Sequence, residues 1–226
     1  MVLPRSAPTP VPAAPPRTYH HGNLRQALVE AALELAQQNG PEGVSVREAA
    51  RRLGVSPAAP FRHFPNRRAL MTAVAEEAAE RLRIEVRKSL GGEKGGGLAR
   101  LHAVGRGYLQ WARRHPAHFR IVSARDQIDL EGSAALRHNI EEVREVTVQA
   151  LQAAQAQGQI AGHHDPSTLA LLARATVYGL ARMNLDGHFG QWGVTPAAVP
   201  AAMDATLDLL ITLLASGRDP ATAATR

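Results

Sequence analysis

A single stretch of the chain decides its fold, and it reads Ser45-Val-Arg-Glu-Ala-Ala-Arg-Arg-Leu-Gly-Val-Ser-Pro-Ala-Ala-Pro-Phe-Arg-His-Phe-Pro-Asn-Arg-Arg-Ala-Leu70. It predicts two short helices joined by a tight turn, followed by the start of a third helix. Ser45 and Glu48 have the spacing of a capping box, which marks the N-terminus of the first helix. Gly54 is expected to end that helix, because the turn needs a residue that tolerates positive φ.

The second helix of this stretch is expected to begin at Ser56, its N-cap, with Pro57 in the first helical position. Pro60 then stands at about the fourth position, where it removes one backbone donor and disfavours helical geometry at Ala59. We therefore expect a short helix with a distorted first turn, not a broken one. A small residue at Ala50, a glycine four positions later and an aliphatic residue after it are typical of a helix-turn-helix.

This second helix is the expected DNA reader. In a helix-turn-helix the second helix lies in the major groove, and its first turn meets the base edges. Small side chains allow a close approach there, cationic ones donate to phosphates or bases, and aromatic ones contact thymine methyl groups. Arg67 and Arg68 begin the third helix, where free N–H groups and cationic side chains hold a phosphate. The predicted DNA contacts within 45–68 are Ser45, Ser56, Ala58, Ala59, Phe61, Arg62, His63, Arg67 and Arg68.

The charge of the chain is concentrated in the same region. The 226 residues carry a formal net charge of +6. Residues 1–68 hold nine arginines, no lysine and four glutamates, a net of +5, whereas residues 69–226 hold seventeen basic and sixteen acidic residues, a net of +1. A basic N-terminal third beside a helix-turn-helix is expected of a module that faces phosphates.

Four pieces of the chain resemble the DNA-binding domain of TetR-type transcriptional regulators over roughly residues 18–75. They are Tyr19-His-His-Gly-Asn-Leu-Arg25, Gly43-Val-Ser-Val-Arg-Glu-Ala-Ala-Arg-Arg-Leu-Gly-Val-Ser56, Ala59-Pro-Phe-Arg-His-Phe64 and Ala69-Leu-Met71. The sequence departs from the family pattern twice: Arg67 replaces a phosphate-contacting lysine, and Phe61 replaces a common tyrosine. A further piece, Ala173-Arg-Ala-Thr-Val-Tyr-Gly-Leu-Ala-Arg-Met183, resembles a C-terminal subgroup with a Trp-His-Gly helix, although Tyr178-Gly179 stands here instead.

The resemblance also implies a homodimer. In the family the last two helices of each subunit form a four-helix interface, which here corresponds to about residues 166–186 and 195–216. Asp204 and Asp208 share a helix face at i, i+4 and are expected either to meet Arg174 or Arg182 or to remain solvated. The predicted interface residues are Arg174, Gly179, Arg182, Asp204, Asp208 and Ile211.

The rest of the sequence predicts an all-α chain of about nine helices with no strand pattern. We expect a disordered Pro-rich arm over 1–17, in which Arg17 is a candidate DNA contact. A DNA-binding domain is expected over 18–75, a helical effector-binding and dimerisation domain over 76–217, and a disordered tail over 218–226. A long helix over 66–90 would connect the two domains, and five glycines in residues 91–97 predict a flexible loop after it.

Other classes of protein are disfavoured by composition. The chain has no cysteine, which excludes a disulfide framework, a thiol redox switch and a Cys-ligated zinc site. No catalytic residues or cofactor are expected, because the chain has no Gly-X-Ser-X-Gly elbow and no phosphate loop. No metal site is expected either, because His163-His164-Asp165 fits a polar turn and Pro116 intervenes between His115 and His118. No signal peptide and no uncharged stretch of membrane-spanning length is apparent, so we expect a cytoplasmic protein without a membrane partner.

Our hypothesis is a dimeric repressor that binds a palindromic operator in double-stranded DNA and is released by a small-molecule effector. The effector would bind among the helices of residues 98–186. Candidate pocket residues are Tyr108, Trp111, Phe119 and Tyr178, each also suited to the plain core. Two alternatives stay open: a regulator that answers to a protein or to no effector, and, less favoured without a catalytic constellation, a helical enzyme or carrier.

Overall fold

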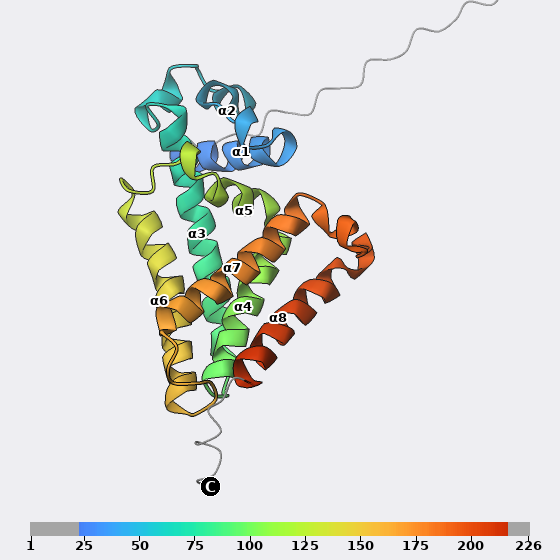
Figure 1. The fold of residues 1–226 in the computed structure, drawn as a ribbon. Coiled ribbons are helices and arrows are strands. Elements are labelled where there is room, and N and C mark those ends of the chain that lie inside the picture. The colour runs from blue at the N-terminus through green and yellow to red at the C-terminus, as the bar shows by residue number, and fades with distance from the viewer. Residues whose placement is uncertain (1–22, 217–226) are drawn as a thin grey trace, which may run out of the picture.

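The computed structural model describes residues 23–216, and within that range it contains eight α-helices, short 3-10 segments and no strand. The all-α prediction is therefore confirmed, and Figure 1 shows a helix-turn-helix end above a longer helical body. Arg17, the arm over 1–17 and the tail over 218–226 lie outside the described residues.

The N-terminal end is built from α1 (Leu24–Asn39), the 3-10 turn η2 (Pro41–Gly43), α2 (Val46–Leu53) and the 3-10 turn η3 (Ala59–Arg62). Asn23 caps α1, because its Oδ1 accepts the N–H of Gln26 at 3.3 Å. Gly54 ends α2 in the left-handed region, with a φ of 67°. The predicted end of this helix at Gly54 is confirmed.

The helix α3 (Arg67–Gly91) joins this end to the body, as the sequence predicts. Asn66 caps it by accepting the N–H of Ala69 at 2.9 Å. The helix packs against α1 near the helix-turn-helix end, and it packs against α4, α5 and α6 in the body. One buried apolar cluster runs from Leu28 in α1 to Leu207 near the C-terminus. The division into 18–75 and 76–217 stays a prediction, since this core crosses it.

The body consists of α4 (Gly97–Arg114), α5 (Pro116–Ser123), the 3-10 turn η4 (Arg125–Gln127), α6 (Ala134–Ala156) and α7 (Pro166–Leu185). It ends with the 3-10 turns η5 (His188–Trp192) and η6 (Pro196–Ala198) and the helix α8 (Val199–Ser216). The central helix is α4, which packs against α3, α6, α7 and α8. This arrangement surrounds α4 with the helices whose side chains form the cavity described below (Figure 1).

The glycine-rich segment after α3 is tied to the end of α6. The N–H of Gly97 donates to Oε1 of Gln157 at 2.8 Å, and the N–H of Leu98 donates to Oε1 of Gln159 at 2.9 Å. A Cβ added to Gly97 would lie 2.1 Å from the backbone nitrogen of Ala154. Gly97 is therefore needed for the close approach of α4 and α6, a role that the prediction of a flexible loop did not include.

One helix of the described range passes a test for membrane spans by length and composition. The segment Pro196–Ser216 has a mean hydropathy of 1.6, and 22% of its apolar window is buried. The segment is not uncharged, because it contains Asp204 and Asp208, and both of these pair with side chains of α4. Met203 and Leu207 on the same helix are buried in the core, so α8 is part of the packed body.

Candidate functional site

The turn that follows α2 forms an exposed tip at one end of the molecule. Ser56 does not cap a helix there. Its carbonyl accepts the N–H of Ala59 at 3.1 Å in a turn, and only the four-residue 3-10 helix η3 follows. The prediction of a short α-helix from Ser56 is therefore wrong, because Pro60 has no N–H to donate and disfavours α geometry at Ala59. The consequence is a compact loop in place of a full reader helix.

The exposed side chains of this loop are those expected to face a partner. Pro60 and Phe64 are buried and anchor the loop to the three-helix core, whereas Ala59 is half-buried. Phe61 is an aromatic side chain with 41% of its surface exposed. The exposed positions are Ser56, Pro57, Ala58, Phe61, Arg62 and His63. The structure thus brings the predicted contact residues of 56–63 onto one solvent-facing loop.

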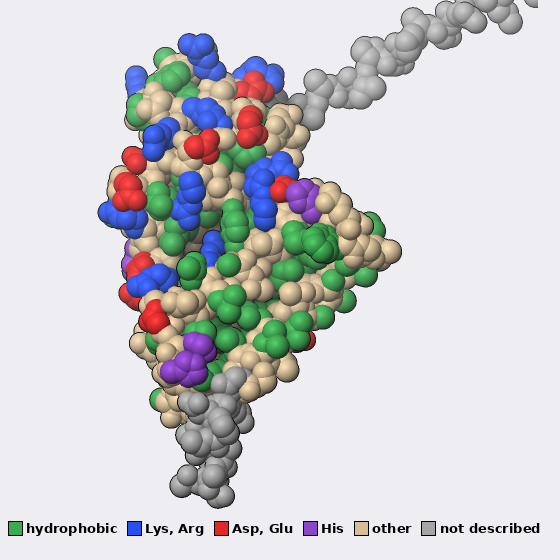
Figure 2. All heavy atoms as spheres, viewed as in Figure 1, with side chains coloured by type: hydrophobic (Ala, Val, Ile, Leu, Met, Phe, Trp, Pro, Cys, Tyr) green, Lys and Arg blue, Asp and Glu red, His purple; other side chains and the backbone are tan. Residues whose placement is uncertain are grey.

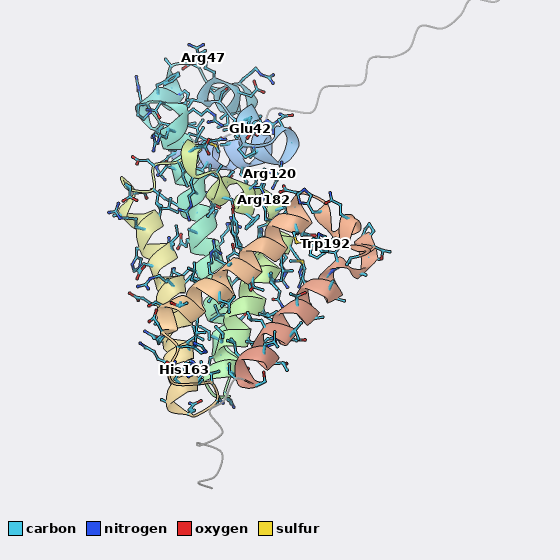
Figure 3. The ribbon with its side chains drawn as sticks, in the orientation of Figure 1. Glu42, Arg47, Arg120, His163, Arg182 and Trp192 are labelled. Carbon is cyan, nitrogen blue, oxygen red and sulfur yellow. The ribbon has the colours of Figure 1, made fainter. Side chains whose placement is uncertain are left out.

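Two arginines at this tip have no partner within residues 23–216. Arg62 is exposed and makes no ion pair or hydrogen bond with the described chain, and the same is true of Arg47. Figure 3 shows Arg47 at the outermost point of the tip, and Figure 2 shows the basic side chains around it. Arg51, by contrast, is bound to Glu48 at 2.6 Å. Sequence reasoning missed Arg47, although its place two residues after the N-cap Ser45 puts it in the exposed first turn.

Ser45 has a structural role in the described chain. Its Oγ accepts the N–H of Glu48 at 3.1 Å and so caps α2. The Glu48 carboxylate binds Arg51 rather than reaching back to Ser45, so the expected capping box is only half formed. The hydrogen bond from Arg51 is the main cause of the lowered pKa of Glu48. Whether Ser45 also contacts DNA stays a prediction.

The side chain of Arg67 is committed to the protein itself. Its Nε donates to the carbonyl of Val44 at 2.8 Å, and its Nη2 donates to the carbonyl of Pro41 at 2.6 Å and to Oε1 of Gln127 at 2.7 Å. These bonds occupy the guanidinium within the protein, and the phosphate contact of Arg67 stays a prediction. The fork of the guanidinium fastens the start of α3 to the α1–α2 connection and to η4.

Arg68 points to the same junction. Its Nη2 donates to the carbonyl of Ile128 at 3.0 Å and lies 3.9 Å from a carboxylate oxygen of Asp129. The side chain stays exposed, but its guanidinium is directed at the body rather than at the tip. Thr72 adds a third link, because its Oγ1 accepts the N–H of Asp129 at 2.8 Å. The loop over 125–129 is thus bound to the first turns of α3.

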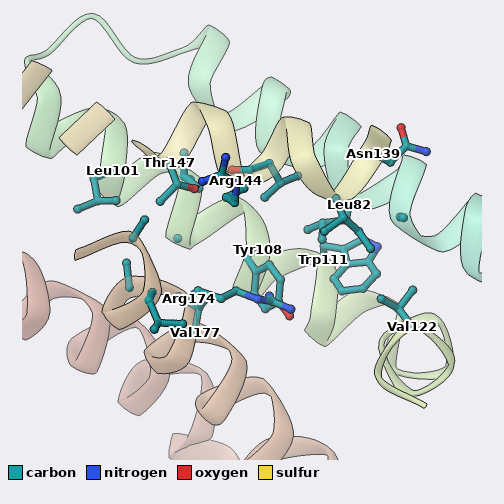
Figure 4. A pocket seen from close by; sticks show the side chains of 18 of the residues that line it. Leu82, Leu101, Tyr108, Trp111, Val122, Asn139, Arg144, Thr147, Arg174 and Val177 are labelled. Atoms are coloured by element: carbon teal, nitrogen blue, oxygen red, sulfur yellow. Dashed lines mark hydrogen bonds between the residues drawn. The ribbon is translucent and has the colours of Figure 1, made fainter. Parts of the chain in front are cut away.

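The second candidate site is a cavity of about 290 Å³ inside the body (Figure 4). Side chains from α3, α4, α6, α7 and α8 line it, and most of them are apolar. Typical apolar lining residues are Leu82, Leu101, Trp111, Val143 and Val177. Among the described residues, no acidic side chain lines this cavity.

Two of the four predicted pocket residues line this cavity, namely Tyr108 and Trp111. Phe119 lies behind them, with its ring centroid 6.1 Å from that of Trp111 and 5.6 Å from that of Tyr178. Phe119 and Tyr178 belong to the aromatic core that supports the wall, not to the wall itself. The Trp111 indole nitrogen is buried with no hydrogen-bond partner in the described chain.

Arg174 lies at the cavity rather than opposite an aspartate of α8. Its guanidinium carbon stands 4.6 Å from the ring centroid of Tyr108 and 5.1 Å from that of Tyr178, and Figure 4 shows it reaching across Tyr108. Burial, opposed by the charge of Arg174, raises the pKa of Tyr108. Arg125 in η4 also lines the cavity, and sequence reasoning missed it, because nothing local marks a loop arginine as facing a pocket.

The other charged residues expected at a subunit interface have partners inside the chain. Asp204 accepts from Nη1 of Arg113 at 3.2 Å, and Asp208 lies 2.7 Å from Nε2 of His102. Arg182 binds Asp186 at 2.6 Å. Within one chain the two aspartates therefore meet side chains of α4, and a contact with Arg174 or Arg182 at a subunit interface stays a prediction.

The outer face of α7 and α8 is apolar and open. Trp192 in the connection between the two helices is 75% exposed. The exposed leucines of the two helices are Leu171, Leu172, Leu209 and Leu213, and Leu171 also lines the cavity. A Cβ added to Gly179 would meet nothing within 4 Å, and Ile211 is half-buried against the second apolar cluster. Hydrophobic side chains gather over both helices in Figure 2.

The histidines of the body do not form a ligand set in the described residues. Over 23–216 no group of three or more His, Cys, Asp or Glu side chains is placed to hold a metal ion. His118 is only 3% exposed, and both of its ring nitrogens lack a hydrogen-bond partner there. Burial first, and then the charge of Arg81, lower the pKa of His118 to about 4, so the ring is neutral at pH 7.

Two family models match the chain. One, described as "Bacterial regulatory proteins, tetR family", matches residues 28–74, and the other, described as "Tetracyclin repressor-like, C-terminal domain", matches residues 101–214. The second model covers half of the chain and includes the cavity helices α6 and α7. The matches do not confirm the Trp-His-Gly subgroup that the sequence around Tyr178 suggested.

Curated relatives match mainly the N-terminal end. The class C tetracycline repressor protein of Escherichia coli is 48% identical over 52 residues, which are 23% of this chain and 24% of that protein. The nucleoid occlusion factor SlmA of Vibrio cholerae is 30% identical over 102 residues, 45% of this chain and 52% of that protein. The match thus spans about a quarter to a half of the length of these relatives. The activities of those proteins are therefore not assigned to this chain.

Solved structures match nearly the whole fold. A protein of unknown function from Rhodococcus sp. RHA1 is 30% identical, with a TM-score of 0.73, over 88% of this chain and 99% of that one. The regulator FadR of Bacillus subtilis, solved with stearoyl-CoA, is 15% identical, with a TM-score of 0.64, over 86% and 99% of the two chains, and shows only the shared fold. From both family models and this fold, the chain belongs to the TetR family of bacterial transcription regulators.

Proposed function

We propose that this regulator is a dimeric repressor that leaves a palindromic DNA operator when a small molecule enters its body. The observation that carries the proposal is the arrangement of the two candidate sites along α3. The exposed loop over 56–63 lies beyond the start of this helix, and Ala79 and Leu82 on the same helix line the cavity. A change at the cavity therefore acts on the element that holds the DNA-binding end.

The DNA contact is assigned to the tip. The loop over 56–63 would enter the major groove, with Ala58 and Ala59 allowing close approach and Arg62 and His63 donating to bases or phosphates. Arg47 would hold a neighbouring phosphate, because it is exposed and unpaired in the described chain. The short η3 in place of a reader helix keeps these side chains on one small surface.

The dimer is assigned to the outer face of α7 and α8. One small module makes too few contacts for useful specificity, whereas two fixed modules read half-sites about 34–36 Å apart or a multiple of that spacing. The exposed leucines of this face and the open surface at Gly179 suit helix packing against a second copy. The protein would work in the cytoplasm, where its DNA target lies.

Effector binding would act as a population shift. A ligand that binds better when the readers have the wrong spacing lowers the affinity for DNA by the same coupling free energy. The contacts from Arg67 and Arg68 to the loop over 125–129 supply a physical link, because Arg125 in the same loop lines the cavity. The alternative, a regulator that answers to a partner protein, leaves this cavity without a role.

The test begins with selection of bound fragments from genomic DNA by the full-length protein. Arg62→Ala is then compared with Arg51→Ala, a matched control, because Arg51 on the same tip is already bound to Glu48. We expect Arg62→Ala to lose operator affinity and to lower the slope of log affinity against log salt by about 1, with the dimer intact. Equal affinity for Arg62→Ala and the parent protein would refute the assignment of the tip.

A further inference from the structure

We propose that the cavity binds an amphipathic monocarboxylate, with an apolar chain between the helices and its carboxylate on Arg174 and Arg125. The inference rests on the proposed function, in that it names the chemical class of the effector. It goes beyond it by assigning the two ends of the ligand to different parts of the cavity.

The apolar end of the ligand follows from the walls. Leu101, Val143 and Val177 face the cavity from three different helices, and Trp111 closes it against α3 and α5. The volume of about 290 Å³ lies at the lower end of the range for ligand pockets, about 300–1,000 Å³. A single short or medium alkyl chain suits such a space, whereas a polar ligand would lose its hydration without gaining hydrogen bonds.

The carboxylate end follows from the arginines. Arg174 lies across the rings of Tyr108 and Tyr178, and Arg125 approaches the same group of side chains from η4. Neither arginine forms an ion pair with any carboxylate of the residues from 23 to 216. Both arginines keep exposed surface, but Arg125 is partly desolvated at the cavity, and this desolvation, followed by the like charge of Arg174, lowers the pKa of Arg125. The two guanidiniums therefore share one region without a counter-charge.

A third arginine shows what a compensated site looks like. Arg144 also lines the cavity, but Nη2 and Nε of its guanidinium bind the carboxylate of Glu141 at 2.6 and 2.9 Å. Arg125 and Arg174 are thus set apart from their neighbour by the missing acid. A guanidinium presents a planar fork of donors that a carboxylate accepts in a bidentate fashion, so a ligand carboxylate supplies the charge that the chain does not.

The geometry disfavours the other ligand classes. The two guanidiniums would repel a cationic ligand, and a neutral ligand would not supply a negative charge to pair with them. A small polar anion would contact the arginines but leave the apolar walls unfilled. A carboxylate with an alkyl chain satisfies both regions at once. It also engages Arg125, two residues before Gln127, which accepts from Arg67 at the start of α3.

The experiment uses the full-length protein and calorimetric titration with decanoate, 1-decanol and decylamine, which share one chain and differ in head charge. We expect decanoate to bind roughly ten- to a hundredfold more tightly than the alcohol, as charge-assisted hydrogen bonds do, and the amine not to bind. Arg174→Gln and Arg125→Gln should each abolish the preference for decanoate over decanol. Arg182→Gln, on the same helix but bound to Asp186, should keep it.

Further arms separate the possible failures. Decanoyl-CoA carries the same chain on a large phosphate-bearing head, and tighter binding of that thioester would overturn the monocarboxylate. Equal affinity for decanoate and decanol would overturn the carboxylate site. If Arg174→Gln unfolds, Arg174→Lys keeps the charge without the fork and should show an intermediate preference. Decanoate that binds but does not release operator DNA leaves the ligand class standing and refutes only its proposed effector role.

Discussion

The guanidinium of Arg67 donates from Nη2 to Oε1 of Gln127 across 2.7 Å, and this bond joins the first residue of α3 to the 3-10 turn η4. The same Nη2 and the Nε of Arg67 bind the carbonyls that connect α1 and α2. One side chain therefore links the α1–α2 connection, the start of α3 and the turn η4. Arg125, which lines the cavity, opens the turn that Gln127 closes.

The first prediction concerns this arginine. Arg67→Ala should lower the free energy of unfolding by about 1–3 kcal/mol, because it removes the Arg67 donor from the carbonyl of Val44 and from Oε1 of Gln127. The carbonyl of Pro41 keeps the N–H of Val44 as a donor. Denaturant unfolding measures this, with Arg47→Ala as the control that loses no bond in the described chain. A loss of DNA affinity at unchanged stability, with a smaller salt slope, would support the phosphate contact that the sequence predicted for Arg67.

The second prediction concerns the approach of α4 to α6. Gly97→Ala should destabilise the protein by about 1–3 kcal/mol, because overpacking at a backbone contact forces the helices apart. The added Cβ would stand 2.1 Å from the backbone nitrogen of Ala154. Gly91→Ala is the matched control, since a Cβ there meets nothing within 4 Å. Thermal unfolding of both variants decides, and equal midpoints would show that α4 shifts without cost.

Features that depend on interactions between residues close in the sequence could be predicted, whereas features that depend on distant residues could not. The cap at Ser45 and the turn at Gly54 depend on residues three or four positions apart, so the local sequence pattern predicts them. Arg67 and Gly97 depend on partners about sixty residues away, Gln127 and Gln157, which no local pattern names. The aromatic residues were recognised as candidates for the pocket, but which of them face the cavity depends on how α4 and α7 pack.

Pro60 illustrates a different failure. Its missing donor and its effect on Ala59 are evident from the sequence, which nevertheless predicts a short helix with a distorted first turn. In the structure the carbonyl of Pro60 accepts the N–H groups of His63 and Phe64, and only a 3-10 turn forms. A segment of this length has too few hydrogen bonds to offset a proline near its centre, so the local cost decides the outcome.

The third prediction concerns the open face of α7. Gly179→Arg should convert the proposed dimer to a monomer, because a long charged side chain would enter the helix packing between the two copies. The fold should survive, since an added Cβ at Gly179 meets nothing within 4 Å and arginine has a higher helix propensity than glycine by about 1 kcal/mol. Light scattering after size exclusion measures the mass.

The control for this prediction is Gln152→Arg, an exposed position on α6 away from that face. It should leave the mass of the dimer unchanged. If Gly179→Arg also leaves it unchanged, the copies associate through another surface, and the apolar face of α7 and α8 needs a different partner. Circular dichroism of both variants shows whether the helices remain, so a loss of fold is not mistaken for a loss of association.

The fourth prediction concerns pH. Burial lowers the pKa of His118 to about 4 in the folded protein, below its usual value of 6.5. Between these two pH values the unfolded chain binds more protons than the folded one. The contribution of His118 to the free energy of unfolding is therefore fully present above pH 6.5 and is lost as the pH falls toward 4. The groups that face the ring are Arg81 and His115, which oppose its protonation, and Glu77, which favours it.

His118→Leu tests this assignment, because it removes the titration while keeping an apolar side chain in the buried position. Both ring nitrogens of His118 lack a hydrogen-bond partner in the described chain, so the variant should be at least as stable as the parent protein at pH 7. Its urea midpoint should fall less steeply than that of the parent between pH 6.5 and 4. The pH dependence of the urea midpoint that remains in His118→Leu comes partly from His115, because burial lowers the pKa of His115 as well. Replacing His115 by Leu, Asn or Gln in the His118→Leu background should therefore reduce this pH dependence further. Identical pH profiles for parent and His118→Leu would mean that the imidazole gains solvent or a partner when it charges.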